Sequence, residues 1–183
     1  GAPAQIRTAP MIGRGLDNYK FSIAVSPVDC TGCGSCSNVC PAKNKAIDMK
    51  PIDEQMDQQE VYDYALKKFS DKHLRFPDNL TKEAQFHRPL LEFSGACGGC
   101  GETPYAKLVT QLFGDHMYIA NATGCSSIWG GSAPSTPYTV NDQGRGPAWE
   151  NSLFEDNAEF GYGMKLAVRQ RRAKLHSVIT ELA

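Results

Sequence analysis

Seven cysteines are the residues of this 183-residue chain whose type and spacing could do chemistry. Four of them form one run, C-x2-C-x2-C-x3-C followed by proline, made of Cys30, Cys33, Cys36 and Cys40. Thiolates this close together on one loop are typical of a [4Fe-4S] cluster, and the small residues between them let backbone N–H groups turn toward the sulfurs. Zinc sites instead use two separated C-x2-C pairs, or one pair with histidines. The run therefore predicts an iron–sulfur site.

The same run raises the question of a second cluster. In two-cluster ferredoxins the fourth cysteine of this motif binds the other cluster. Cys30, Cys33 and Cys36 would then hold one cluster, and Cys40 would reach a cluster whose other ligands lie in an upstream motif. Residues 1–29 contain no such motif. The chain is therefore expected to be cut from a longer one, with a single self-contained cluster as the alternative.

The other three cysteines form a second incomplete set. Cys97 and Cys100 make up "CGGC", and Cys125 follows in a glycine-rich segment. His116 or His87 could complete a zinc site of three cysteines and one histidine, although His116 is expected in an exposed turn. Two alternatives stay open here: a cluster that lacks one ligand, and a non-catalytic electron-transfer or zinc-stabilised binding module.

The composition narrows the class of protein. The net charge is −1, with 41% hydrophobic and 21% charged residues, which is typical of a folded protein without a nucleic-acid or membrane-binding surface. No apolar run approaches the roughly 18 residues of a membrane-spanning helix, and no signal-peptide core follows the N-terminus. An intracellular protein is expected, in which clustered cysteines bind metal more often than they form disulfides.

Short elements are expected around the first cysteine run. After an extended arm over residues 1–18, a β-type run over 19–25 places Phe21, Ile23 and Val25 on one face, and "KAIDMKPI" reads as a second strand. A strand, a cysteine loop and a strand make half of a ferredoxin-like iron–sulfur domain, which we expect over residues 19–75. A helix over 53–72 completes it and aligns four apolar residues on one side: Met56, Val61, Ala65 and Phe69.

A second unit is expected over residues 91–183, after a linker at 76–90. Thr103 with Pro104 predicts a helix start and Gly114 its end, with a buried face of Leu108, Val109 and Leu112. A strand over 117–122, a glycine-rich loop around Cys125 and a long helix over 155–182 follow. This order is an α/β layout, in which ligands gather at the carboxyl ends of strands. The expected fold class is thus α+β followed by α/β.

Four segments resemble pyruvate:ferredoxin oxidoreductase: "VDCTGCGSCSNVCPAK", "FSGACGGCGETPYAKLVTQLFGD", "IANATGCSSIWGGSAPSTPYT" and "GRGPAWENSLFEDNAEFGYGM". They cover most of residues 19–172. The resemblance implies oxidative decarboxylation of pyruvate with coenzyme A to acetyl-CoA and CO2, with electrons passing through [4Fe-4S] clusters to ferredoxin or flavodoxin. It also implies a homodimer in the cytoplasm or an anaerobic organelle, and the N-terminal part of a thiamine-diphosphate-binding α/β domain over residues 91–183.

The resemblance also implies roles for single residues. It assigns Cys30, Cys33 and Cys36 to one ferredoxin-type cluster, Cys40 to the other, and Cys97, Cys100 and Cys125 to a proximal cluster, and it places Glu102 and Cys125 against thiamine diphosphate. The family's first ferredoxin motif, its fourth proximal cysteine and its G-D-G…N segment, which holds Mg2+ and the diphosphate, are missing from these residues. An internal fragment, inactive without the rest of its parent chain, is therefore expected. Packing is the expected role of Trp129 and Trp149, and a surface-loop charge that of Arg145.

Overall fold

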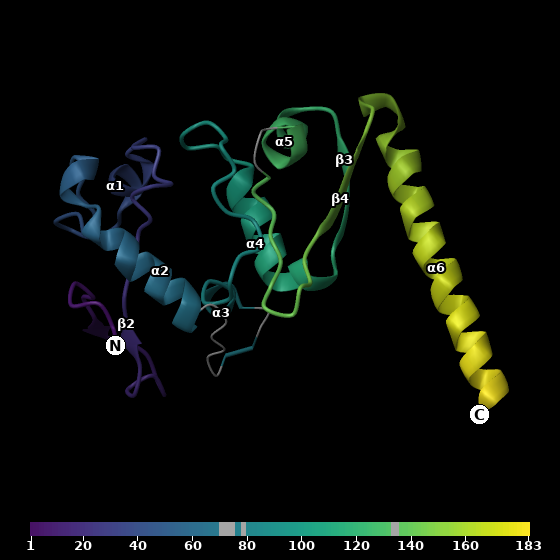
Figure 1. Cartoon of the computed structure of the whole chain (residues 1–183), viewed down its shortest axis with the longest axis horizontal. Coiled ribbons are helices and arrows are strands. Elements are labelled where there is room, and N and C mark those ends of the chain that lie inside the picture. The colour runs from purple at the N-terminus through teal and green to yellow at the C-terminus, as the bar shows by residue number, and fades with distance from the viewer. Residues whose placement is uncertain (70–75, 78–79, 133–135) are drawn as a thin grey trace. The chain divides into compact units, whose positions relative to one another are not determined.

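Figure 1 shows the chain as a computed structural model, which describes residues 1–69, 76–77, 80–132 and 136–183. The chain divides into two compact units. Unit 1 comprises residues 1–88 and 97–112, and unit 2 comprises residues 89–96 and 113–183. Within the described ranges, no helix is both long and apolar enough to cross a bilayer.

Unit 1 consists of short helices and one small antiparallel pair of strands. Strand β1 (Ala9–Pro10) pairs with β2 (Lys20–Phe21), so part of the expected arm takes part in a hairpin. The helices are α1 (Ser35–Val39), α2 (Asp57–Phe69), α3 (Thr81–Ala84) and α4 (Thr103–Phe113), of which only the last residue of α4 falls in unit 2. Leu16, Val61 and Ala84 are buried in this unit. Mixed helices and small strands agree with an α+β fold at this coarse level.

The strands expected on either side of the cysteine run are only partly present. Strand β2 covers two residues of the run at 19–25, and Ile23 and Val25 remain 62% and 49% exposed. The second strand, "KAIDMKPI", is absent, and its last residue begins a 3-10 turn, Ile52–Glu54. That prediction is wrong because a strand is stabilised by pairing with a neighbour, and residues 45–51 pair with no strand in the described part of the chain.

Helix α2 confirms most of the helix expected over residues 53–72. It begins at Asp57 and runs to Phe69, while residues 70–72 lie outside the described residues. Val61 is buried as the periodicity predicts, but Met56 and Phe69 are 47% and 50% exposed. The apolar side of α2 is therefore covered only near its middle.

Helix α4 has the predicted bounds but a different buried side. It spans Thr103–Phe113 and is followed by a 3-10 turn that starts at Gly114. Its buried residues are Thr110 and Gln111, whereas Leu108 and Leu112 are half-buried and Val109 is 41% exposed, so the expected face of Leu108, Val109 and Leu112 is only partly covered. These polar residues can be buried because they are hydrogen-bonded: the Thr110 hydroxyl donates to the carbonyl of Lys107, 2.7 Å away, and Gln111 donates to another carbonyl.

Unit 2 is built on two parallel strands. Strand β3 (Tyr118–Ala122) confirms the predicted strand and pairs in register with β4 (Ala148–Ser152), which the sequence did not predict. Between them, the residues expected as a glycine-rich loop form the one-turn helix α5 (Cys125–Ser127) and a π-helical turn, Ile128–Ser132. The last residues of that loop, 133–134, lie outside the described residues.

The long C-terminal helix is confirmed as α6 (Asn157–Leu182), the yellow helix in Figure 1. It follows β4 through a 3-10 turn, Phe154–Asp156, and packs back on the sheet at Gly161, where an added Cβ would lie 3.3 Å from the Cβ of Ala120. Trp129 is buried, and an added Cβ at Gly131 would overlap the indole of Trp149. Both tryptophans therefore pack inside unit 2, as expected.

Candidate metal centre

The first cysteine run is a loop that ends in a single helical turn. Gly32 and Gly34 take left-handed φ angles of 69° and 73°, which glycine adopts without a steric penalty. Helix α1 starts directly after Gly34 and contains Cys36, while Cys33 stays in the loop. The run is therefore the expected loop with one added turn, and three of its cysteines (Cys30, Cys33, Cys36) are exposed while Cys40 is partly exposed.

Two sulfurs of this run lie next to hydrogen-bonding groups. The Sγ of Cys33 lies 3.4 Å from the Ser35 hydroxyl, which lowers the pKa of the Cys33 thiol. The backbone N–H of Ala46 donates to the Sγ of Cys40 at 3.2 Å and is the main reason that the pKa of Cys40 is lowered. Both interactions favour the thiolate, which is the form of cysteine that binds metal.

The "CGGC" loop, residues 97–100, also places a cysteine sulfur next to backbone N–H groups. The N–H of Cys100 donates to the carbonyl of Cys97 at 2.9 Å, and Gly99 takes a φ of 76° in the turn between them. The backbone N–H groups of Thr103 and then Glu102, at the start of α4, lower the pKa of Cys100. A helix start favours a negative charge, so this turn too stabilises a thiolate.

The two cysteine loops of unit 1 touch each other. An added Cβ at Gly98 would lie 2.6 Å from the Cβ of Cys33, and one at Gly99 would lie 3.3 Å from the Ser35 hydroxyl. Only a residue without a side chain allows this approach at Gly98. The contact was not predicted, and the paired glycines of "CGGC" were its one visible signal in the sequence.

Cys125 belongs to unit 2. It is exposed and is the first residue of α5, just beyond the carboxyl end of β3, where the sequence predicted it. Its turn is closed by Ser127, whose hydroxyl accepts from the N–H of Gly124 at 2.8 Å. Because Cys97 and Cys100 belong to unit 1, their convergence with Cys125 stays a prediction. Glu102 is exposed directly before α4, and its contact with a cofactor also stays a prediction.

Polar side chains join the carboxyl ends of β3 and β4. The amide of Asn121 donates to the Oδ1 of Asn151 at 2.9 Å, and the Thr123 hydroxyl donates to the carbonyl of Ser152 at 3.2 Å. These bonds hold the strand end from which Cys125 follows. Sequence reasoning missed these residues because nothing in the local pattern shows that β4 pairs with β3.

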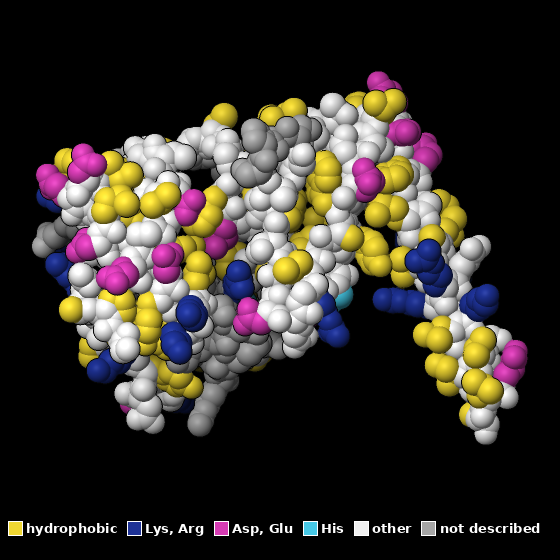
Figure 2. Space-filling model, in the orientation of Figure 1, with side chains coloured by type: hydrophobic (Ala, Val, Ile, Leu, Met, Phe, Trp, Pro, Cys, Tyr) yellow, Lys and Arg dark blue, Asp and Glu magenta, His cyan; other side chains and the backbone are white. Residues whose placement is uncertain are grey.

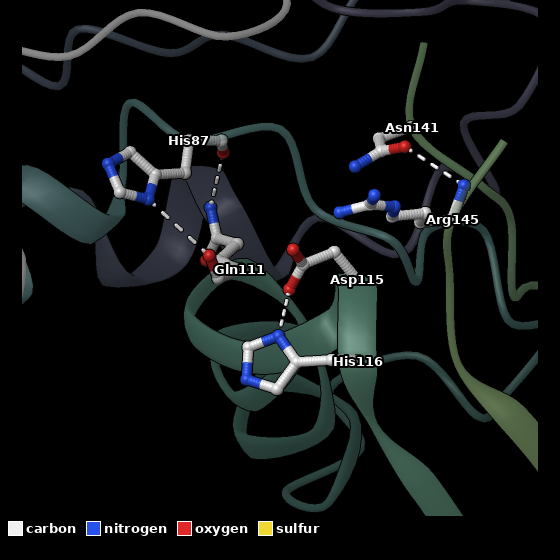
Figure 3. A network of polar contacts seen from close by, with 6 residues as sticks. All are labelled: His87, Gln111, Asp115, His116, Asn141 and Arg145. Carbon is white, nitrogen blue, oxygen red and sulfur yellow. Dashed lines mark hydrogen bonds and ion pairs between the residues drawn. The ribbon is translucent and has the colours of Figure 1, made fainter. Parts of the chain in front are cut away.

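Figure 3 shows the surroundings of His87, His116 and Arg145. In unit 1, the Nε2 of Gln111 donates to the carbonyl of His87 at 3.0 Å. In unit 2, the Nδ1 of His116 pairs with the Oδ1 of Asp115, and the His116 side chain is 71% exposed, as expected for a turn. The backbone N–H of Arg145 donates to Asn141 at 3.0 Å. Among the residues that the structure describes, no group of three or more Cys, His, Asp or Glu side chains is arranged to hold a metal ion.

Comparison of the sequence with known proteins finds close relatives, although no family model matches the chain. Pyruvate:ferredoxin oxidoreductase of Moorella thermoacetica is 59% identical over 182 residues, which is 99% of this chain and 16% of that protein. Pyruvate-flavodoxin oxidoreductase of Klebsiella pneumoniae is 58% identical over 175 residues, or 94% of this chain and 15% of that protein. Pyruvate dehydrogenase (NADP+) of Cryptosporidium parvum is 50% identical over 92% of this chain and 9% of its own length. The chain therefore belongs to the pyruvate:ferredoxin and pyruvate-flavodoxin oxidoreductase family, and it spans 9% to 16% of the length of these relatives.

Proposed function

We propose that this chain is the part of a pyruvate oxidoreductase that holds [4Fe-4S] clusters next to a thiamine diphosphate site. The whole enzyme would convert pyruvate and coenzyme A into acetyl-CoA and CO2 and reduce ferredoxin or flavodoxin. Relatives named for these two acceptors, 59% and 58% identical to the chain, support the proposal. The structural observation that carries it is the packing of the "CGGC" loop on Cys33 within unit 1.

The first cysteine run fits a cluster by the chemistry of its donors. Cys30, Cys33 and Cys36 are the proposed ligands of one cluster, and Cys40 is a ligand of another. The Ser35 hydroxyl and the Ala46 N–H lie against two of these sulfurs and favour their thiolate forms. A bound cluster of this kind supplies one-electron transfer, and hydrogen bonds to the sulfurs help to set its potential.

The second set is proposed to bind a proximal cluster through Cys97, Cys100 and Cys125. Glu102 and Cys125 are the proposed contacts to thiamine diphosphate. An added Cβ at Gly101 or at Gly124 would meet no atom within 4 Å, so the backbone next to both residues is open to a ligand. These openings fit a cofactor that approaches the chain closely. The Mg2+ ion that accompanies the diphosphate is proposed to bind outside these residues.

The contact at Gly98 gives the two cysteine sets a fixed relation in unit 1. A methyl-sized group cannot be inserted there without displacing Cys33, because the loops already touch. We infer that the contact keeps the ligands of one cluster at a constant separation from two ligands of the next. A constant separation is what a chain of electron carriers requires.

Cys125→Ser in the full-length protein, reconstituted anaerobically with iron and sulfide, tests the proposal. We expect about four iron atoms per subunit to be lost, the content of one [4Fe-4S] cluster, while the ferredoxin-type signals persist in electron paramagnetic resonance spectra. Formation of acetyl-CoA should fall by orders of magnitude. Thiamine diphosphate should bind almost as well as before. Ser126→Ala, in the next residue of the same turn, is the matched control and should keep its iron.

The outcomes separate the proposal from its alternative. Full iron content with near-normal turnover in Cys125→Ser would make Cys125 an ordinary small residue and remove its site role. A colourless wild-type protein that retains zinc after the same treatment would instead support the zinc-stabilised binding module.

A further inference from the structure

A groove of about 450 Å3 lies in unit 2 between strand β3 and helix α6. The helix touches the strand at Gly161, next to Ala120, and the groove opens beyond that contact. Its apolar part is lined by Tyr118, Ala120, Gly161, Met164 and Val168. Tyr118 is 63% exposed, so the face of its ring is available to a ligand.

Three cations of α6 also line this groove. Lys165, Arg169 and Arg172 follow one another at helical spacing on α6 and all border the groove. In the described part of the chain, no carboxylate forms an ion pair with any of the three. Figure 2 shows Lys and Arg side chains gathered on the middle of α6, with one of them projecting away from the helix. They span about 10 Å along the helix axis, at 1.5 Å per residue, so they can contact more than one phosphate.

The groove lies away from Cys125, the cysteine of unit 2. Tyr118 is the first residue of β3, and Cys125 follows the other end of that strand. Four residue steps of about 3.3 Å separate the two ends of β3 by about 13 Å. Because the proposed cofactor contact of Cys125 is at the carboxyl end, the cationic groove is a separate site.

We propose that this groove binds a nucleotide with a diphosphate group. Lys165, Arg169 and Arg172 would contact the phosphates, since guanidinium and ammonium groups are the usual donors to phosphate oxygens. The ring of Tyr118 and the apolar side chains beside it would cover the base. The volume of the groove falls within the usual range for small-molecule pockets. This proposal does not depend on the iron–sulfur assignment.

Calorimetric titration of the full-length protein with adenosine diphosphate and with inorganic pyrophosphate tests the groove. We expect both probes to saturate and to bind more weakly as salt is raised. Arg169→Glu replaces an attraction to phosphate by a repulsion and should weaken the binding of both probes by about tenfold. Arg171→Glu makes the same charge change on the same helix, but Arg171 does not line the groove. It is the matched control and should alter either dissociation constant by less than about twofold.

Tyr118→Ala tests the position of the base. It should weaken the binding of adenosine diphosphate by about fivefold, the effect of losing one stacking contact, and leave the binding of pyrophosphate unchanged. Equal changes for both probes would place the base elsewhere and contradict the assignment. Absence of saturable binding by the wild type, or equal losses in Arg169→Glu and Arg171→Glu, would overturn the groove as a site. Iron content after reconstitution should be the same in all these variants, so a failed cluster assignment remains distinguishable from a failed groove.

Discussion

Gly98→Ala tests the contact between the two cysteine loops of unit 1. The new Cβ would lie 2.6 Å from the Cβ of Cys33 and 3.6 Å from its Sγ. Carbon atoms prefer separations of about 3.5–4.0 Å, so the loops would have to move apart by about 1 Å. Insertion of a methyl group into such a contact costs about 1–3 kcal/mol. The backbone adds no cost, because Gly98 has no left-handed φ.

The change in thermal stability of the 183-residue chain measures this contact. For a chain of this size, 1 kcal/mol shifts the Tm by about 2–4 °C, so Gly98→Ala should lower the Tm by about 2–12 °C in circular dichroism melts of the metal-free protein. Gly101→Ala is the control, because a Cβ there meets nothing within 4 Å and its φ is not left-handed. Equal Tm values for the two variants would show that the loops do not touch, and the reasoning about a fixed separation of the cysteine sets would fail.

Three further predictions follow from single contacts. The backbone N–H of Ala46 lowers the pKa of Cys40, so the thiolate forms below the pH at which a free cysteine ionises. Iodoacetamide should therefore alkylate Cys40 of the metal-free protein at a lower pH than it alkylates a cysteine-containing model peptide, as measured by mass spectrometry. Gly131→Ala overlaps the half-buried indole of Trp149 and should destabilise the chain by about 1–3 kcal/mol in urea titrations. Gly163→Ala, at an open position in the N-terminal part of α6, should stabilise it by about 0.5–1 kcal/mol, and the same sign for both would contradict the packing. Asn121→Ala removes the side-chain hydrogen bond to Asn151 and should lower the free energy of unfolding by about 1 kcal/mol in the same assay. An unchanged urea midpoint would show that this hydrogen bond is not formed.

Local patterns in the sequence predicted the elements that depend on neighbouring residues. Helix α4 begins at Thr103 and ends before Gly114, as capping and breaking signals predict. Strand β3 and helix α6 also occupy the expected places. The two helices depend mainly on residues within a few positions, and the apolar run of β3 is visible in a short window of sequence even though its pairing with β4 is not.

Pairing and burial depended on residues far apart in the chain. The expected strand at "KAIDMKPI" is absent because it has no partner in the described residues, and β4 forms because β3 lies beside it. Helix α4 buries Gln111 because its side chain donates to the carbonyl of His87, 24 residues away in the chain. None of these partners can be identified from local periodicity.

The sequence by itself determined the family and predicted the chemistry. The spacing of Cys30 to Cys40 is a local property that predicts an iron–sulfur site in preference to a zinc site, and four long segments carry the resemblance, which a relative 59% identical to the chain confirms. Only the tertiary structure decided that the "CGGC" loop rests on Cys33 and that cations of α6 border a groove next to Tyr118. Both are contacts between segments distant in sequence, and folding selects them by shape and by the free energy of packing, which no spacing rule records.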